Sequence, residues 1–358
     1  MMMMKMRRKV GTLGCVWLLI VPLMVFSLCL LLHLHHYLPP LANTTLLRRS
    51  TLCHALSASL YSKLTNLYTP VVPMEYVNPV SRLLYWERKT TDSYLRVQLA
   101  LAESSGSLAT PRGPPLADVG TLKDLRTFQP LLTPREKAQL LYAFELFSAV
   151  CQNNNLRFFL ANNSLLGSLR HHGVIPWSDV SITVSMRAED QALVRKVLDS
   201  REDVTLMWSN PYAWSLRLRH TRPDPPDLLR MTYISIQFYR ENSTHLWAET
   251  WGNKRLFTAA KERVFPLALR PFEGQLVPVP CDVSSVMEQG DAEQCRAVLE
   301  DEEEMVFRDA GLLPCSVLSK VFPFVGRRLA MAPGRTVEQV LVNGTLLYTA
   351  LVETGWAG

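Results

Sequence analysis

The sequence has little of several residues and motifs that define specialised classes of protein. Its 358 residues include only 16 Gly and 7 Cys, which excludes a collagen-like chain and a small disulfide scaffold. Hydrophobic residues make up 48% of the chain, so it can bury a sizeable core and is not disordered. It has no Cys-x-x-Cys pair, no zinc-type histidine cluster and no sign of a Ser-His-Asp triad. A structural zinc and hydrolase chemistry therefore have no support.

The net positive charge is also small beyond the first residues. The formal net charge is +6, but Lys5, Arg7, Arg8 and Lys9 precede the first hydrophobic run and leave only +2 for the remainder. A nucleic-acid partner is therefore not expected.

A long apolar stretch covers residues 10–33 and is sufficient to span a bilayer. A cleaved signal peptide is the alternative, but its apolar region is usually only about 7–15 residues and ends at small residues. This run ends instead at His33, Leu34, His35 and His36. We predict an uncleaved signal anchor, with residues 1–9 as a cytoplasmic tail and the later residues in the lumen. The expected protein is a single-pass type II protein of the Golgi or ER membrane.

A luminal location permits glycosylation and disulfide bonds. Asn43, Asn242 and Asn343 begin acceptor sequons and are the expected glycosylation sites, whereas the sequon at Asn162 lies beside the proposed site described below. Two of the seven cysteines belong to the membrane span, which leaves five in the lumen. Because five is odd, one luminal cysteine is unpaired and offers a route to oligomers.

Prolines and small polar residues break the pattern over residues 34–130, which we interpret as a luminal stem with a few short helices. The globular domain is assigned to residues 131–358. It begins with Thr133, Pro134 and Glu136, which match an N-cap, a first-turn proline and the third position of a capping box. Apolar residues at helical spacing extend this helix to about Gln152.

The next segment alternates short helices with strands. A strand is predicted over 156–160 and a brief helix over 164–170. From Asp179 the residues alternate strictly, with Asp179 and Ser181 on one face and Val180 and Ile182 on the other. A helix over 189–198 and strands over 204–208, 213–220 and 229–239 follow. The prediction is an α+β fold, a mixed sheet with flanking helices and a site on its polar face.

Several motifs in order resemble the LicD/fukutin family of nucleotidyltransferase-fold proteins. The family signature runs Gly-Ser/Thr-Leu-Leu-Gly, then Arg-His-His-Gly-x-Ile-Pro-Trp, then an acidic Asp-Asp-Asp-apolar-Asp. The matching segments are Ser164-Leu165-Leu166-Gly167, Arg170 to Trp177, Tyr233 to Tyr239, Glu241 to His245, Phe265-Pro266-Leu267, Arg270 to Gly274 and Val277 to Pro280. Together they cover about residues 135–297.

The resemblance implies transfer of phosphocholine or ribitol phosphate from a CDP-linked donor to a glycan or glycoprotein acceptor. It also implies Mg²⁺ or Mn²⁺, held by carboxylates that point the same way from a strand and neutralise the donor pyrophosphate. The substrate-binding residues that it implies are Ser164, Gly167, Arg170, His171, His172 and Trp177.

The acidic positions of the signature are largely missing here. A gapless match after Trp177 sets apolar residues at two of them, whereas deleting one position aligns Asp179 with the third Asp and Ser181 with the last. We prefer the deletion because it preserves the alternation. Ser235 then stands where the neighbouring strand carries a further Asp, so the expected centre consists of Asp179, Ser181 and Ser235, with Asp179 as the metal ligand.

Two function classes remain open from the sequence. In one, the chain is an active transferase; in the other, which the missing carboxylates favour, it is a catalytically impaired or inactive protein of glycan modification. Structural roles compete with the functional ones. Trp177 is more often a core residue than a base-stacking one, and at most one of His171 and His172 faces a site because adjacent helical residues diverge.

The resemblance also suggests a disulfide bond. Cys281 and Cys295 flank the segment after Val279-Pro280, where the family domain closes its last loop, and 13 residues separate them. A bridge of that size contributes about 3 kcal/mol in the loop-entropy model. We therefore predict a Cys281–Cys295 pair.

Overall fold

The computed structural model describes residues 78–106, 125–178, 180–208, 212–219, 232–248, 258–283, 286, 294–301, 306–332 and 335–353. All of them lie in one compact unit of the chain. The predicted cytoplasmic tail, membrane segment and first part of the stem, together with Asn43 and Asp179, lie outside the described residues. None of the helices within the described ranges is both long and apolar enough to cross a membrane.

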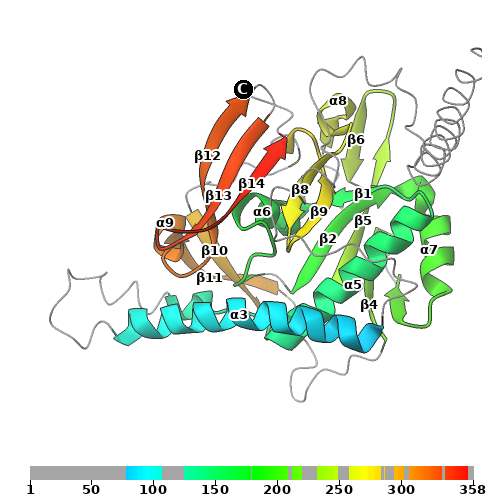
Figure 1. The fold of residues 1–358 in the computed structure, drawn as a ribbon. Helices are drawn as coiled ribbons and strands as arrows, with labels where there is room; N and C mark the ends of the chain where they lie inside the picture. Colours follow the sequence, from blue (N-terminus) through cyan, green and yellow to red (C-terminus); the bar gives the residue numbers. More distant parts are fainter. Residues whose placement is uncertain are drawn as a thin grey trace, which may run out of the picture. The chain divides into compact units, whose positions relative to one another are not determined.

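A mixed sheet forms the centre of the fold (Figure 1), as the sequence predicts. Its strands run in the order β1-β2-β5-β4-β3, and β6 and β7 extend it from β5. Only the β2–β5 pair is parallel among these strand pairs; the other pairs are antiparallel. The strands are β1 (Phe158–Leu160), β2 (Ser181–Arg187), β3 (Val204–Met207), β4 (Ala213–Leu218), β5 (Tyr233–Glu241), β6 (His245–Ala248) and β7 (Thr258–Ala260).

Helix α5 (Pro134–Asn153) covers the apolar face of this sheet. The Thr133 hydroxyl accepts a hydrogen bond from the Glu136 amide, and the Glu136 carboxylate accepts one from the Thr133 amide, so the predicted capping box is confirmed. Phe144 and Phe147 of α5 pack against Phe158, and the cluster continues to Ile236 of β5. Alternation in the strands and helical spacing in α5 thus bury one common core.

Helix α3 (Pro79–Gly106) packs alongside α5 (Figure 1) and corrects the stem prediction. It is one long helix inside the segment where we expected short ones. Trp86 is fully buried in the main core and donates a hydrogen bond from Nε1 to Glu145, which also pairs with Arg82. The folded unit therefore includes residues on the N-terminal side of residue 131.

Short helices and a hairpin follow strands of the central sheet along the chain. Helix α6 (Asn162–Arg170) follows β1, and η3 (Ala188–Asp190) leads into α7 (Gln191–Asp199). The hairpin β8 (Ala268–Phe272) and β9 (Gln275–Val279) turns at Glu273 and Gly274, both with positive φ. Two further short helices are η2 (Arg126–Phe128) and α8 (Lys261–Val264).

The chain ends in further antiparallel strands. β10 (Gln294–Asp301) pairs with β11 (Val306–Pro314), and α9 (Cys315–Leu318) leads to the three-stranded sheet of β12 (Phe324–Ala332), β13 (Arg335–Val342) and β14 (Thr345–Glu353). Strand β14 contacts β8, and β12 contacts α6. The C-terminal strands therefore close directly on the segment that carries the family motifs.

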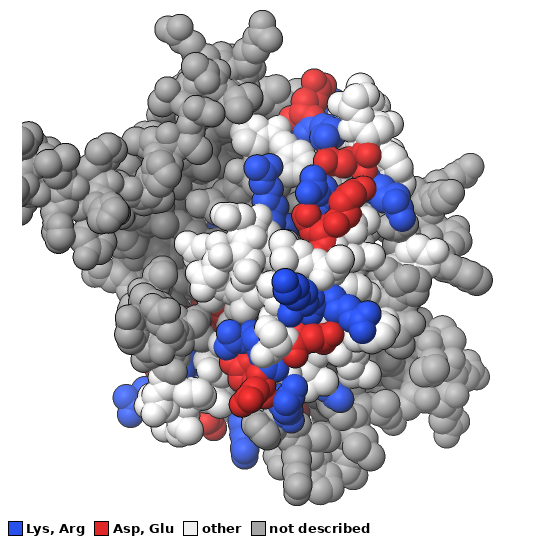
Figure 2. All heavy atoms as spheres, turned by 90° about the vertical axis from the view of Figure 1, so that its right-hand side faces the viewer, with Lys and Arg blue, Asp and Glu red and all other residues white. Residues whose placement is uncertain are grey.

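The charged residues on one face of the molecule are intermixed in sign (Figure 2). On α7 and its neighbours, Arg195 pairs with Asp199 at 3.3 Å and Arg187 with Asp190 at 2.8 Å. Such exposed pairs contribute little to stability, and this face offers no strong field of one sign.

Candidate functional site

The β2 and β5 strands present a polar face where the sequence places the site. Their parallel register sets Thr183 opposite Ser235 and Ser181 opposite Tyr233, with side chains on the same side of the sheet. The alternate residues Ile182 and Ile236 are fully buried in the core on the other side. The structure thus brings Ser181 and Ser235 to one face, although the direct neighbour of Ser235 is Thr183.

Within the described part of β2, β4 and β5, this face carries neutral polar groups instead of carboxylates. Beside Ser181 and Ser235 lie the side chains of Gln237 on β5 and Ser215, which stands opposite Ser235 on β4. Among the described residues, no group of three or more His, Cys, Asp or Glu is arranged to hold a metal ion. Divalent cations of the Mg²⁺ type need carboxylate oxygens, so this described donor set does not fit the metal that the resemblance implies.

Two carboxylates of the family segment take part in ion pairs. Glu273 pairs with Lys137 at 2.9 Å and accepts a hydrogen bond from the Val174 amide, and Asp282 pairs with Arg263 at 3.5 Å. Each of these two carboxylates therefore already has a cationic partner.

Two residues of α6, Ser164 and Gly167, make close packing contacts with neighbouring segments. Ser164 is fully buried, and its hydroxyl accepts a hydrogen bond of 2.8 Å from the Thr183 amide of β2. A Cβ on Gly167 would come within 2.2 Å of the Gly173 carbonyl oxygen, so glycine there allows the loop after α6 to pass close to the helix. Both residues that we predicted to bind substrate thus have clear structural roles.

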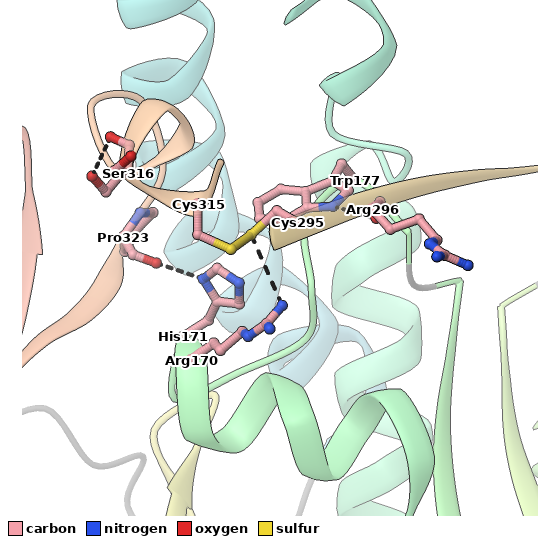
Figure 3. The surroundings of a disulfide bond; sticks show 9 residues. Arg170, His171, Trp177, Cys295, Arg296, Cys315, Ser316 and Pro323 are labelled. Carbon is pink, nitrogen blue, oxygen red and sulfur yellow. Dashed lines mark hydrogen bonds between the residues drawn. A yellow bond between two sulfur atoms is a disulfide. The ribbon is translucent and has the colours of Figure 1, made fainter. Parts of the chain in front are cut away.

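The loop after α6 is anchored in a second core cluster (Figure 3). Trp177 is 2% exposed, donates from Nε1 to the carbonyl of Arg296 at 3.1 Å and packs against Phe322. Arg170 lies part-buried with a guanidinium nitrogen 3.9 Å from the Cys295 sulfur, and burial lowers its pKa. Stacking of Trp177 on a substrate base is incompatible with this burial.

His171 belongs to the same cluster. Its Nδ1 lies 2.6 Å from the Pro323 carbonyl oxygen, which accepts only, so Nδ1 carries the proton. Burial lowers the pKa of His171 to about 3, although the hydrogen bond to Pro323 opposes this shift. The ring is therefore a neutral structural group at physiological pH and not an acid for catalysis.

The predicted Cys281–Cys295 disulfide is wrong. Cys295 bonds to Cys315, 20 residues further along, and the bridge lies beside His171 and Trp177 (Figure 3). The hairpin of β10 and β11 explains the pairing, because it sets residue 295 next to Leu313 and so brings the start of α9 back to the start of β10. Cys281 is also disulfide-bonded.

Cys151 is free and buried in the main core, where desolvation raises its pKa. A second chain therefore has no access to its thiol in the folded state.

His172 lies in a buried ionic network with the C-terminal sheet. Its Nε2 is 2.7 Å from the Glu338 carboxylate, which also receives Arg270 at 2.7 Å and Arg328 at 3.0 Å. Its Nδ1 lies 3.2 Å from the Tyr348 hydroxyl. A neutral ring satisfies both contacts, because Nε2–H donates to Glu338 while Nδ1 accepts from Tyr348.

The pKa values agree with this arrangement. Burial lowers the pKa of His172, and its hydrogen bond to Glu338 only partly offsets the shift. Burial alone would raise the pKa of Glu338, but the charge of Arg270 and the hydrogen bond from His172 bring it down to about 2. Sequence reasoning missed Glu338 and Arg270 as partners because nothing in a strand pattern marks which charged residue faces inward.

A cavity of about 1000 Å³ opens between α3, the start of α5, the loop after α6 and the β13–β14 turn. Its lining includes Lys89, Lys137, Glu273, His171 and His172. Desolvation lowers the pKa of Lys89, against the opposing charge of Glu273. His171 and His172 thus line this cavity at the end of α6 opposite to Ser164, while their rings bond to Pro323 and Glu338.

The described sequons lie at exposed turns. Asn343 and Gly344 form the positive-φ turn between β13 and β14. Asn242 lies between β5 and β6 and accepts hydrogen bonds from the amides of Thr244 and His245. Asn162 begins α6 and is exposed.

Comparison with known families agrees with the motifs. Residues 155–282 match the family described as LicD/FKTN/FKRP, nucleotidyltransferase domain, and this match confirms the predicted resemblance for that segment. A domain of this class points to a glycan-related, phosphotransferase-like function. The match ends before β10, so the C-terminal strands lie beyond it.

Comparisons with individual proteins add little. No curated protein matches the chain. Among solved structures, the lincosamide antibiotic adenylyltransferase LnuA in its lincomycin-bound form has 13% sequence identity and a TM-score of 0.26, covering 42% of this chain and 85% of its own.

Proposed function

We propose that this chain is a type II membrane protein of the secretory pathway that takes part in glycan or glycoprotein modification without metal-dependent phosphotransfer. The polar face of β2 and β5 carries the proposal. In the preferred alignment Ser181 and Ser235 stand at positions where the family has carboxylates, and their side chains lie on one face of β2 and β5. Neutral hydroxyl dipoles do not replace the charge that holds a divalent ion. The fold is retained, which suits a binding or partner role.

Catalysis is tested with the full chain in detergent, incubated with CDP-linked donors, a glycan acceptor and Mg²⁺ or Mn²⁺. We expect no metal-dependent transfer. The competing function is an active transferase that works with Asp179 as the one remaining carboxylate at an acidic position of the signature. Robust transfer from a CDP donor that is abolished by Asp179→Ala would establish that function and overturn the proposal.

A gain-of-binding experiment tests the assignment of the two serines. Replacing Ser181 and Ser235 together by Asp should raise the affinity for Mn²⁺ at least tenfold, because two carboxylates then lie on one face of adjacent strands. The matched control is Thr205→Asp on β3, which shares this face but lies two strands from β5. Titration calorimetry with Mn²⁺ measures both. Equal affinities in the double variant and the control would contradict the assignment.

Topology and glycosylation form a separate part of the proposal. Glycosidase treatment should lower the apparent mass of the protein, with Asn43, Asn242 and Asn343 as acceptors, and protease added to sealed vesicles should leave the C-terminal part intact. An unglycosylated chain that protease digests from the outside would overturn the type II assignment without affecting the assignment of the serines.

A further inference from the structure

An exposed apolar stripe runs along the outer face of α3. Val80, Leu84, Leu95 and Leu99 are 65%, 60%, 53% and 62% exposed. At 100° per residue these four side chains fall within an arc of about 100° on the helix, a width typical of a face that packs on another helix. The opposite face, with Trp86, is the one buried against α5. The stripe therefore faces away from the core of its own chain.

The stripe is complementary to itself when two copies of α3 are antiparallel. In such a pair, two residues lie opposite each other when their numbers add up to a constant. Leu84 with Leu95 and Val80 with Leu99 give the same constant, 179, so both apolar pairs form in a single register. An interface of this kind repeats the same patch on both subunits, as a two-fold dimer requires.

The charges on this face select the antiparallel arrangement. Arg88 and Asp92 are both exposed and lie near the middle of the stripe. In the register above, Arg88 of one copy is opposite residue 91 of the other, one position and about 1.5 Å along the axis from Asp92. The two-fold symmetry repeats this contact, so the interface contains two pairs of opposite charges. A parallel, in-register pair would instead set Arg88 against Arg88 and Asp92 against Asp92.

We propose that α3 is a dimerisation surface, whose partner is the α3 helix of a second copy of this chain in the antiparallel register. A lipid surface suits the stripe less well, because an ionic pair at its centre would enter the apolar layer. Anchoring of both copies in one membrane would favour the contact further, because it raises their effective concentration. This inference does not depend on the catalytic state of the domain.

Sedimentation velocity of the full chain in detergent micelles tests the surface. The wild type should be dimeric, and Leu95→Asp should raise the dissociation constant at least tenfold. Leu193→Asp is the matched control, because Leu193 is also a leucine on a helix surface, 41% exposed on α7. Arg88→Asp and Asp92→Arg should each weaken the dimer, and their combination should restore it.

Cysteine cross-linking tests the register. The Leu84→Cys/Leu95→Cys double variant should form disulfide-linked dimers, whereas Leu84→Cys alone should not. A monomeric wild type, a Leu95→Asp variant that dimerises as strongly as the wild type, or cross-linking by Leu84→Cys alone would overturn the proposal. A monomer that binds phosphatidylcholine vesicles through Leu95 would assign the stripe to lipid instead.

Discussion

At the scale of single residues, Glu338 connects three separate parts of the chain. Its side chain is 2% exposed and holds three cationic or donor groups that come from different parts of the chain: Arg270 on β8, Arg328 on β12 and His172 after α6. Breaking a buried charge network by removing one partner costs several kcal/mol, because the remaining charges are left without compensation.

We expect Glu338→Gln to lower the free energy of unfolding by about 3 kcal/mol. The amide keeps the size of the side chain but removes the charge that compensates Arg270, which is 6% exposed. Urea denaturation followed by tryptophan fluorescence measures the change. Asp199→Asn, which breaks an exposed pair with Arg195, should change the stability by less than about 1 kcal/mol. Equal effects of the two substitutions would argue against the network.

Some features of the fold and site could be predicted from the sequence and others could not, for physical reasons. The capping box at Thr133 and the strand after Val180 are local, so they can be read directly and are confirmed. The strand is not half-buried as expected, because Thr183 and Ser185 on its polar face are also buried. The burial of Trp177 and the partner of Cys295 depend on strands more than 100 residues after α6 and on the β10–β11 register, which a single sequence does not contain. The side-chain chemistry of the β2–β5 face could be predicted, whereas the structural use of the motif around His171 could not.

At the scale of elements, the contact between α6 and the loop that follows it positions two buried histidine side chains. The Gly167 carbonyl accepts hydrogen bonds from the amides of His171 and Gly173, so the chain turns back tightly on the last turn of the helix. This turn directs His171 toward Pro323 and His172 toward Glu338. The spacing of the motif from Gly167 to Gly173 is therefore a packing requirement of one short helix.

We expect Gly167→Ala to lower the free energy of unfolding by about 1–3 kcal/mol or more, because the new Cβ would overlap the Gly173 backbone and the loop would have to move. Gly344→Ala is the comparison. Its Cβ would contact nothing within 4 Å, so only the positive φ of 75° opposes it, at about 1 kcal/mol. Thermal denaturation should rank Gly167→Ala as the more damaging change; the reverse order would contradict the packing argument.

At the scale of the whole molecule, buried histidines tie stability to pH. His171 has a pKa of about 3 in the folded protein, and the pKa of His172 is also lowered. In the unfolded chain both titrate near about 6.5, so below that pH the unfolded state binds protons that the folded state does not. Stability is therefore fully present above about pH 6.5 and declines as the pH falls.

His171 should contribute a loss of about 1.4 kcal/mol per pH unit below that point, and the lowered pKa of His172 adds a loss in the same direction. Glu338 adds a further loss below about pH 4, where its unfolded-state carboxyl takes up a proton and the folded one does not. Denaturation in urea at pH 7.5, 6 and 5 measures the slope. His171→Asn, which keeps a donor for Pro323, should reduce this slope. A flat profile between pH 7.5 and 5 would refute the assignment of neutral, buried rings.

The Glu338 network also decides how much of the gene is needed for a stable product. The family match ends at residue 282, yet His172 and Arg270 within it find their counter-charge on β13. A premature stop codon after residue 330 would spare every family motif and still remove that carboxylate together with Tyr348. We expect such a truncated polypeptide to be retained and degraded as a misfolded protein, so that late nonsense variants behave as null alleles.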